Sequence, residues 1–193
     1  MLAALPDDGG GTFEETESAT RLRRPVATDG PAITALIAAC PPLDGNSAYC
    51  NLLQCTDFAD TCIVAERNGT IVGWISGYRL PSQPEELFIW QVAVAAQARG
   101  ERLASRMLDH LVRRAQIQPI AFLSSTVTAG NRASWALFEG FARSRQAPLE
   151  KAVRFDRTAH FADAHDTEWC ARIGPFRSAA TDSAEPNSSK ESI

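Results

Sequence analysis

A short basic turn at residues 97–104, Gln-Ala-Arg-Gly-Glu-Arg-Leu-Ala, carries the clearest chemical pattern in the sequence. It follows an apolar run that ends at Val94 and precedes an amphipathic segment, so it is placed to open a helix. The first N–H groups of a helix are unpaired and carry partial positive charge, which suits a pyrophosphate. Gly100 lets the backbone approach closely, and Arg99 and Arg102 add charge-assisted donors. The turn therefore predicts an anion site.

Two elements must position this turn. Residues 87–94, Leu-Phe-Ile-Trp-Gln-Val-Ala-Val, are almost continuously apolar and predict a central strand. Residues 99–115 predict a helix, because their apolar side chains recur at helical spacing, at Leu103, Met107, Leu108, Leu111 and Val112. We therefore expect the anion site between the end of a buried strand and the start of a helix.

The rest of the middle of the chain alternates strands and helices. Asn68-Gly69 between two β-rich runs predicts a hairpin with a type I′ turn. Further strands are expected at 21–26, 61–67, 70–78, 119–127, 151–155 and 168–173, and further helices at 29–40, from Asn46 or Ser47 to Phe58, and at 131–142. Hairpins join some strands and helices join others. This predicts an α/β (α+β) fold with a mixed central β-sheet of about six to seven strands flanked by about four helices.

Net charge is distributed unevenly along the chain. Residues 1–20 carry −5 and residues 178–193 carry −2, while the whole chain carries −4, which leaves +3 for residues 21–177. This mild excess suits an anionic ligand and is too weak to indicate nucleic-acid binding. Neither terminal segment has a core-forming pattern, so we expect two disordered tails around a single domain at 21–177.

Composition excludes several classes of protein. No apolar run reaches the length of a membrane span, and the first residues lack the basic and apolar segments of a secretory signal. The five cysteines include no CxxC pair. We therefore expect free thiols, no metal site and a cytoplasmic location.

The basic turn resembles the GCN5-related N-acetyltransferases. That superfamily carries a Q/R-x-x-G-x-G/A motif after its fourth strand, and Gln97-x-x-Gly100 is similar to it. Arg102 stands where the family usually has Gly or Ala. Because a residue with a Cβ disfavours positive φ, we expect Arg102 either to strain the turn or to contact a phosphate.

Other segments resemble the diaminobutyrate acetyltransferases within that superfamily. They lie between about residues 21 and 175, at 40–49, 58–62, 87–94, 131–138, 165–168 and 172–174. The resemblance implies the GCN5-related fold and direct acetyl transfer, in a ternary complex, from acetyl-CoA to the γ-amino nitrogen of L-2,4-diaminobutyrate. That reaction is a step of ectoine biosynthesis. The resemblance also implies a homodimer.

The resemblance assigns one set of residues to acetyl-CoA. Its thioester is expected along residues 91–94, where strands splay apart and the Val92 and Val94 N–H groups hold the pantetheine arm and polarise the acetyl carbonyl. Asn131 is similar to the family's helix-capping asparagine beside the CoA arm. The implied cofactor-binding set is Gln91, Val92, Ala93, Val94, Arg99, Gly100, Glu101, Arg102, Leu103, Ala104 and Asn131.

The resemblance assigns a second set to the amine. The substrate-binding candidates are Asp44, Tyr49, Trp90, His165 and Glu168, of which Asp44, Tyr49 and Glu168 are also the catalytic candidates. Carboxylates and an aromatic ring suit a substrate with two ammonium groups, and a proton must leave the γ-nitrogen before it attacks. Plainer readings remain open, since Asp44 can simply form a turn and Trp90 can pack in the core.

One position departs from the superfamily. Many members place a Tyr on the last major helix to protonate the leaving thiolate, and Phe138 stands in the comparable place here. The general acid is then another group, such as Tyr49, or water. Two alternatives also stay open. The chain is an N-acetyltransferase for another small diamine or amino acid, or it is a CoA-binding module without turnover.

Overall fold

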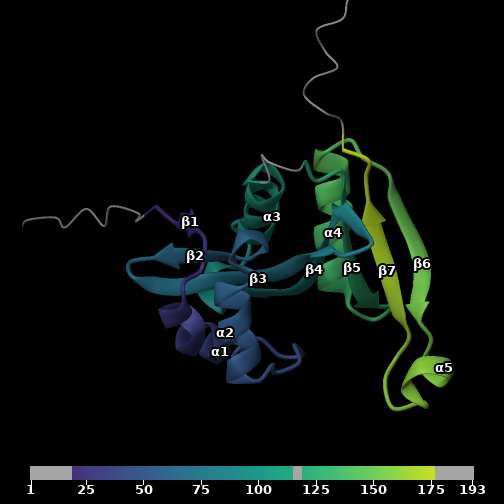
Figure 1. The fold of residues 1–193 in the computed structure, drawn as a ribbon, viewed down its shortest axis with the longest axis horizontal. Helices are drawn as coiled ribbons and strands as arrows, with labels where there is room; N and C mark the ends of the chain where they lie inside the picture. The colour runs from purple at the N-terminus through teal and green to yellow at the C-terminus, as the bar shows by residue number, and fades with distance from the viewer. Residues whose placement is uncertain (1–18, 115–118, 177–193) are drawn as a thin grey trace, which may run out of the picture.

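The computed structural model describes residues 19–114 and 119–176 (Figure 1). Within them, one mixed sheet has the strand order β1-β2-β3-β4-β5-β7-β6. Its strands are β1 (Arg21–Arg23), β2 (Ile63–Arg67), β3 (Thr70–Leu80), β4 (Gln83–Val94), β5 (Phe122–Thr128), β6 (Leu149–Phe155) and β7 (Glu168–Ile173). The expected mixed α/β (α+β) architecture is confirmed. Apart from residues 19 and 20, the two expected tails lie outside the described residues.

The longer helices lie on both faces of the sheet, and the short α5 (Arg157–Phe161) lies beyond the ends of β6 and β7 (Figure 1). The longer helices are α1 (Gly30–Ala38), α2 (Ala48–Thr56), α3 (Leu103–Arg114) and α4 (Arg132–Ser144), with 3₁₀ turns at η1 (Ala27–Asp29), η2 (Ala59–Thr61) and η3 (Ala96–Ala98). Figure 1 shows α1 and α2 on the opposite side of β2–β4 from α3. In the part of the chain that the structure describes, no helix is long and apolar enough to cross a membrane.

Two apolar clusters hold these layers together. The larger one packs α3 and α4 against β2–β5 and β7 and includes Met107, Leu108, Phe138 and Phe141. The smaller one packs α1 and α2 against β2–β4, where Trp74 is fully buried. Since no residue of β5, β6 or β7 belongs to the smaller cluster, the α1–α2 pair covers only the first half of its face of the sheet.

A β-bulge interrupts the β3–β4 hairpin near the middle of the sheet. Ser76 pairs with Gln91 and Gly77 pairs with Ile89, so Trp90 has no partner on β3. A bulge re-aims the extra side chain, and Trp90 is 50% exposed on a strand whose neighbours are buried. A Cβ at Gly77 would lie 2.6 Å from the Phe88 carbonyl oxygen. Glycine at position 77 therefore permits the close strand contact at this bulge.

Three differences from the sequence-based expectations have local causes, besides shifts of one to three residues at other element ends. Helix α3 begins at Leu103 rather than Arg99, because Gly100 (φ 85°) and Arg102 (φ 58°) adopt left-handed conformations that a helix cannot include. Strand β4 begins at Gln83 rather than at Leu87. Its first residues are polar and exposed, so the sequence pattern did not distinguish them from a loop. Helix α5 was not expected, because five residues are too short to show helical periodicity.

We expect Gly77→Ala to lower the free energy of unfolding by about 1–3 kcal/mol, because the added methyl group meets the Phe88 carbonyl and forces the strands apart. Urea-induced unfolding measures the change. Gly140→Ala is the control. It lies in the interior of α4 with space around it and should stabilise the protein by about 0.5–1 kcal/mol. Equal stability of Gly77→Ala and the wild type would contradict the assigned contact.

Candidate active site

Strands β4 and β5 separate in the middle of the sheet. Their parallel pairing covers only Glu86–Ile89 against Phe122–Ser125. At its last step the Ser125 hydroxyl donates a hydrogen bond of 2.9 Å to the Ile89 carbonyl. Beyond that point β5 continues paired with β7, whereas residues 91–94 of β4 pair only with β3. One edge of β4 is therefore left without a partner strand among the described residues.

The strand register decides which backbone groups face this separated edge. The Ala95 N–H donates to the Val72 carbonyl at 2.9 Å, so it faces β3. N–H groups point to alternate sides along a strand, so that of Ala93 also faces β3 and those of Val92 and Val94 face the separated edge. These two donors lie about 7 Å apart. They can hold two acceptors of an extended chain that is laid along β4.

Arg99 brings positive charge to the same edge. Its Nε donates to the Val94 carbonyl at 3.1 Å, and its Nη2 lies 3.8 Å from the Cys40 sulfur. The Cys40 thiol contacts the same Val94 carbonyl at 3.5 Å. The guanidinium therefore lies against the end of β4, between the separated edge and the turn that follows.

The basic turn leads into α3 as expected. The Arg106 N–H donates to the Arg102 carbonyl at 3.1 Å, so the helix starts directly after the turn. The Glu101 carboxylate is bound by the Arg67 guanidinium of β2, which leaves the backbone of Glu101 for a ligand. Leu103 is buried in the core, so it too offers only its N–H group. Ala104, half-buried, follows it in the first helical turn.

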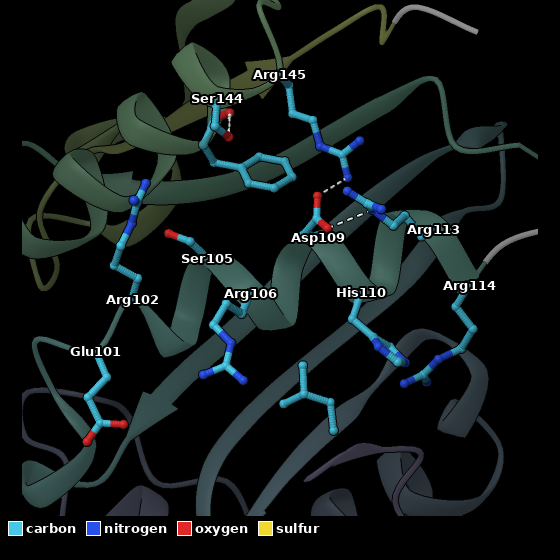
Figure 2. A pocket seen from close by; sticks show the side chains of 12 residues that line it. Glu101, Arg102, Ser105, Arg106, Asp109, His110, Arg113, Arg114, Ser144 and Arg145 are labelled. Atoms are coloured by element: carbon cyan, nitrogen blue, oxygen red, sulfur yellow. Dashed lines mark hydrogen bonds and ion pairs between the residues drawn. The ribbon is translucent and has the colours of Figure 1, made fainter. Parts of the chain in front are cut away.

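A basic groove of about 1230 Å³ runs along α3 beside this turn (Figure 2). Towards the C-terminus of α3, Asp109 pairs with both Arg113 and Arg145. Arg102 and Arg106, nearer the N-terminus, form no ion pair within the described part of the chain. Uncompensated positive charge therefore lines the groove along the whole of α3, including the turn at its start.

Gln91 has a side-chain role that sequence reasoning missed. It is 7% exposed, and its Nε2 donates to the Asp44 carbonyl at 2.6 Å while its Oε1 accepts from Asn46 Nδ2 at 2.8 Å. The loop that carries Asp44 is thereby fastened to the central strand. The sequence did carry a signal for this role, since Gln91 is a polar residue inside the apolar run 87–94. A buried amide must find hydrogen-bond partners.

Glu168 is the centre of an acidic cluster at the start of β7. Its side chain is 18% exposed, its Oε1 lies 3.8 Å from His165 Nε2, and its Oε2 is buried without a hydrogen-bond partner in the described residues. Burial raises the pKa of Glu168, and the negative charges of Asp44 and Asp166 raise it further, although His165 and Thr126 lower it. The fold thus brings Asp44, His165 and Glu168 into one electrostatic cluster.

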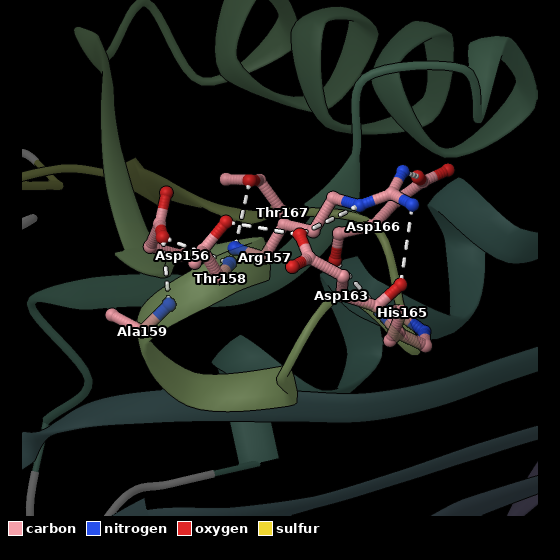
Figure 3. A network of polar contacts seen from close by, with 8 residues as sticks. All are labelled: Asp156, Arg157, Thr158, Ala159, Asp163, His165, Asp166 and Thr167. Carbon is pink, nitrogen blue, oxygen red and sulfur yellow. Dashed lines mark hydrogen bonds and ion pairs between the residues drawn. The ribbon is translucent and has the colours of Figure 1, made fainter.

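A braced loop holds His165 (Figure 3). Asp156 caps α5 by accepting the Thr158 and Ala159 N–H groups. The Arg157 guanidinium then reaches across the loop to Asp166 at 3.2 Å and to Asp163 at 3.4 Å. The His165 ring packs on Phe161 with centroids 4.7 Å apart. These contacts order the segment that leads into Glu168.

The remaining candidates differ in their placement. Trp90 is half exposed, and its ring meets the Tyr78 ring edge-on, with centroids 6.3 Å apart. Asn131 caps α4 through its Oδ1, which accepts the Ser134 N–H at 3.1 Å. Tyr49 is 70% exposed and has no hydrogen-bond or ring partner in the described residues. Phe138 is buried in the core.

Arg102 adopts a conformation that costs a residue with a Cβ about 1–2 kcal/mol. We expect Arg102→Gly to relieve that strain and to raise the melting temperature by a few degrees. Differential scanning calorimetry measures the change. Arg106→Gly is the control, because it lies inside α3 and should destabilise the protein. A lower melting temperature for Arg102→Gly would mean that the side chain stabilises the turn.

The raised pKa of Glu168 has a consequence for stability. A carboxyl whose folded-state pKa exceeds its unfolded value stabilises the fold fully at low pH and loses that contribution as pH rises through the folded pKa. We therefore expect Glu168→Gln to melt at a higher temperature than the wild type at pH 7. The difference should disappear below about pH 4. Thermal melts across this range measure it.

Glu139→Gln supplies the opposite control for that pH series. The Lys151 ammonium lowers the pKa of Glu139 through a hydrogen bond of 2.9 Å, so this substitution should not raise the melting temperature at neutral pH. A pH-independent effect of Glu168→Gln would contradict the burial of an ionised carboxylate.

Comparison with known proteins agrees with this geometry. The model of the acetyltransferase (GNAT) family matches residues 31–141. The structure of diaminobutyrate acetyltransferase EctA from Paenibacillus lautus, in complex with L-2,4-diaminobutyric acid and coenzyme A, superposes with a TM-score of 0.78 at 39% identity, covering 83% of this chain and 98% of that one. The ribosomal-protein-S18-alanine N-acetyltransferase of Escherichia coli, with a TM-score of 0.62 and 16% identity, shares the fold alone.

Curated relatives narrow the assignment. The L-2,4-diaminobutyric acid acetyltransferase of Methylotuvimicrobium alcaliphilum is 48% identical over 156 residues, which cover 81% of this chain and 91% of that protein. Its counterpart in Vibrio cholerae is 48% identical over 151 residues, which cover 78% of this chain and 87% of that protein. The chain therefore belongs to the GNAT family of acetyltransferases and, within it, to the L-2,4-diaminobutyric acid acetyltransferases.

Proposed function

We propose that this chain transfers the acetyl group of acetyl-CoA directly to the γ-amino nitrogen of L-2,4-diaminobutyrate. The observation that carries the proposal is the separated edge of β4, which has the basic turn at one end and the cluster of Asp44, His165 and Glu168 nearby. Similarity to relatives that bear this activity in their names supports the choice of substrate.

In this proposal the separated edge binds the acyl donor. The N–H groups of Val92 and Val94 hold the pantetheine arm, and one of them polarises the thioester carbonyl where negative charge develops during attack. The pyrophosphate is bound by the backbone at Gly100, by the N–H groups at the start of α3 and by the side chains of Arg99 and Arg102. Asn131 and the start of α4 border the same arm. Acetyl-CoA supplies the activated acetyl group.

The carboxylates serve the amine in two roles. Asp44 holds one ammonium group, and Glu168 accepts the proton that the γ-nitrogen must lose before it attacks the carbonyl carbon. Burial makes Glu168 the better base, because a raised pKa brings a carboxylate closer to the pH at which it must accept a proton. Trp90 adds a ring face for a cation, and His165 stands against Glu168.

Expulsion of the thiolate completes the transfer. The new N–C bond forms as the C–S bond breaks, and the thiolate of coenzyme A then takes a proton. Phe138, in the place of the superfamily's tyrosine, has no proton to give. Water or Tyr49 supplies it, and the exposure of Tyr49 favours water unless a loop or a second subunit covers that ring.

Three wider assignments belong to the same proposal. The first is that the proposed reaction serves as a step of ectoine biosynthesis. Free thiols at Cys40, Cys50, Cys55, Cys62 and Cys170 support a reducing cytoplasm. A homodimer is the expected assembly, and the exposed Val153 and Phe155 on the edge strand β6 are consistent with a further contact.

The alternatives differ in what they do with the amine. An acetyltransferase for another diamine or amino acid would keep the β4 edge and the basic turn but prefer lysine, ornithine or a polyamine. A CoA-binding module without turnover would bind acetyl-CoA and release no CoA when amines are added. The buried Oε2 of Glu168 has no hydrogen-bond partner among the described residues, and this favours an enzyme, because such a group is costly unless a cation or a proton meets it.

We expect acetyl transfer to L-2,4-diaminobutyrate with product acetylated at the γ-nitrogen, as identified by NMR. Asp44→Asn and Glu168→Gln should each lower kcat/KM for the diamine at least about 30-fold, the loss typical of a charged partner in a partly buried site. Asp44→Asn should act mainly on KM. Glu168→Gln should act mainly on kcat and remove the low-pH limb of its pH profile.

Acetyl-CoA binding, measured by calorimetry, should stay intact in both variants, which separates loss of the amine site from misfolding. Asp57→Asn is the matched control, since Asp57 lies at the far end of α2 from Asp44. Acetylation chiefly at the α-nitrogen, or equal use of lysine and ornithine, would count against the proposed substrate. Near-normal kcat/KM in both variants would remove Asp44 and Glu168 from the site.

A further inference from the structure

The proposed substrate leaves one of its charges without a partner. L-2,4-diaminobutyrate carries two ammonium groups and one carboxylate. In the proposed site, Asp44 and Glu168 bind the two ammonium groups. The carboxylate needs a cation or several N–H donors, because a desolvated charge without a partner is costly. Given the proposed function, on which this inference rests, a further side chain must meet that carboxylate.

Most cations near this face of the sheet already have acidic partners. Arg172 pairs with the buried Glu86 at 2.7 Å, and Arg157 pairs with Asp163 and Asp166. Arg154, by contrast, forms no ion pair with any carboxylate in the described residues. It is half-buried, so its charge is partly shielded from water.

A bulge leaves Arg154 without a partner on β7, on the face of the sheet that carries Glu168. On β6, Val153 pairs with Trp169 and Phe155 pairs with Glu168, so Arg154 is the extra residue between them. Its guanidinium carbon lies 5.0 Å from the centre of the Phe88 ring on β4. The register places Phe88 level with Ser124, on the same face as Cys170 and Glu168.

Aromatic rings connect this guanidinium to the tryptophan of the proposed site. The ring centroids of Phe88 and Tyr78 lie 5.2 Å apart, and those of Tyr78 and Trp90 lie 6.3 Å apart. Stacking on a ring fixes the plane of a guanidinium without using its N–H donors. Arg154 therefore presents oriented donors beside an apolar wall, as bidentate binding of a carboxylate requires.

The spacing fits the substrate. Arg154 also hydrogen-bonds Cys170, which lies two residues from Glu168 on the same face of β7 and hence about 7 Å along the strand. In L-2,4-diaminobutyrate four bonds separate the carboxylate carbon from the γ-nitrogen, a span of about 5 Å at ordinary bond lengths. A carboxylate held by Arg154 would leave the γ-nitrogen beside Glu168.

We propose that Arg154 binds the α-carboxylate of the diamino acid and so makes the enzyme select an amino acid over a plain diamine. The side chains divide the substrate by charge: Asp44 and Glu168 take the two nitrogens, and Arg154 takes the carboxylate. Nothing in the basic turn or the β4 edge is involved, so the acyl donor binds independently of Arg154.

The test compares L-2,4-diaminobutyrate with 1,3-diaminopropane, which is the same molecule without its carboxylate. We expect Arg154→Gln to lower kcat/KM for diaminobutyrate at least about 30-fold, mainly through KM, and to change kcat/KM for diaminopropane less than threefold. Arg154→Lys should recover part of the loss, because it restores the charge without the planar fork. The KM for acetyl-CoA should not change.

The controls separate selection from general damage. Arg21→Gln removes an exposed charge on β1 and should leave both substrates unaffected. Equal losses for diaminobutyrate and diaminopropane in Arg154→Gln would overturn the inference, and so would a wild type that prefers diaminopropane. A wild type that acetylates neither compound overturns the proposed function itself. The role of Arg154 alone is overturned if the wild type acetylates diaminobutyrate and Arg154→Gln has the same ratio of kcat/KM for diaminobutyrate to kcat/KM for diaminopropane.

Discussion

The separation of β4 from β5 beyond Ile89 is the constraint on which the rest of the site depends. A strand in the middle of a sheet normally uses both rows of its backbone donors, and none remain for a ligand. Here the second row stays unused by a neighbouring strand at Val92 and Val94. The same separation leaves that edge open beside the basic turn, so the proposed donor and acceptor sites can meet there.

Buried polar side chains maintain that arrangement. Ser125 satisfies the Ile89 carbonyl where the pairing stops, and Gln91 satisfies the Asp44 carbonyl and the Asn46 amide where the loop crosses the strand. Each would be costly in the interior without a partner. Their hydrogen bonds connect the loop before α2 to the central strand, so the position of Asp44 follows from the position of β4.

Several local features oppose stability at the places where chemistry is proposed. Arg102 adopts a left-handed conformation, Trp90 is half exposed, and Glu168 is buried with its Oε2 unpaired in the described residues. Such costs persist when the surrounding structure holds them and a ligand can use them. A phosphate at the turn and a cation beside Glu168 would each supply the missing partner. The two large apolar clusters outweigh these costs and keep the sheet and helices fixed around the site.

The sequence by itself determined the features that depend on local patterns. The Asn68-Gly69 hairpin, the apolar run of β4, the amphipathic face of α3 and the glycine turn between them follow from residue spacing and turn chemistry, which need no distant partner. Family resemblance added Asp44, His165 and Glu168 without saying how they meet. Only the tertiary structure decided the bulge at Trp90, the side-chain role of Gln91 and the orientation of Arg154, because each depends on the register between strands far apart in the chain. A shift of one residue turns every side chain to the other face, and no local pattern fixes that choice.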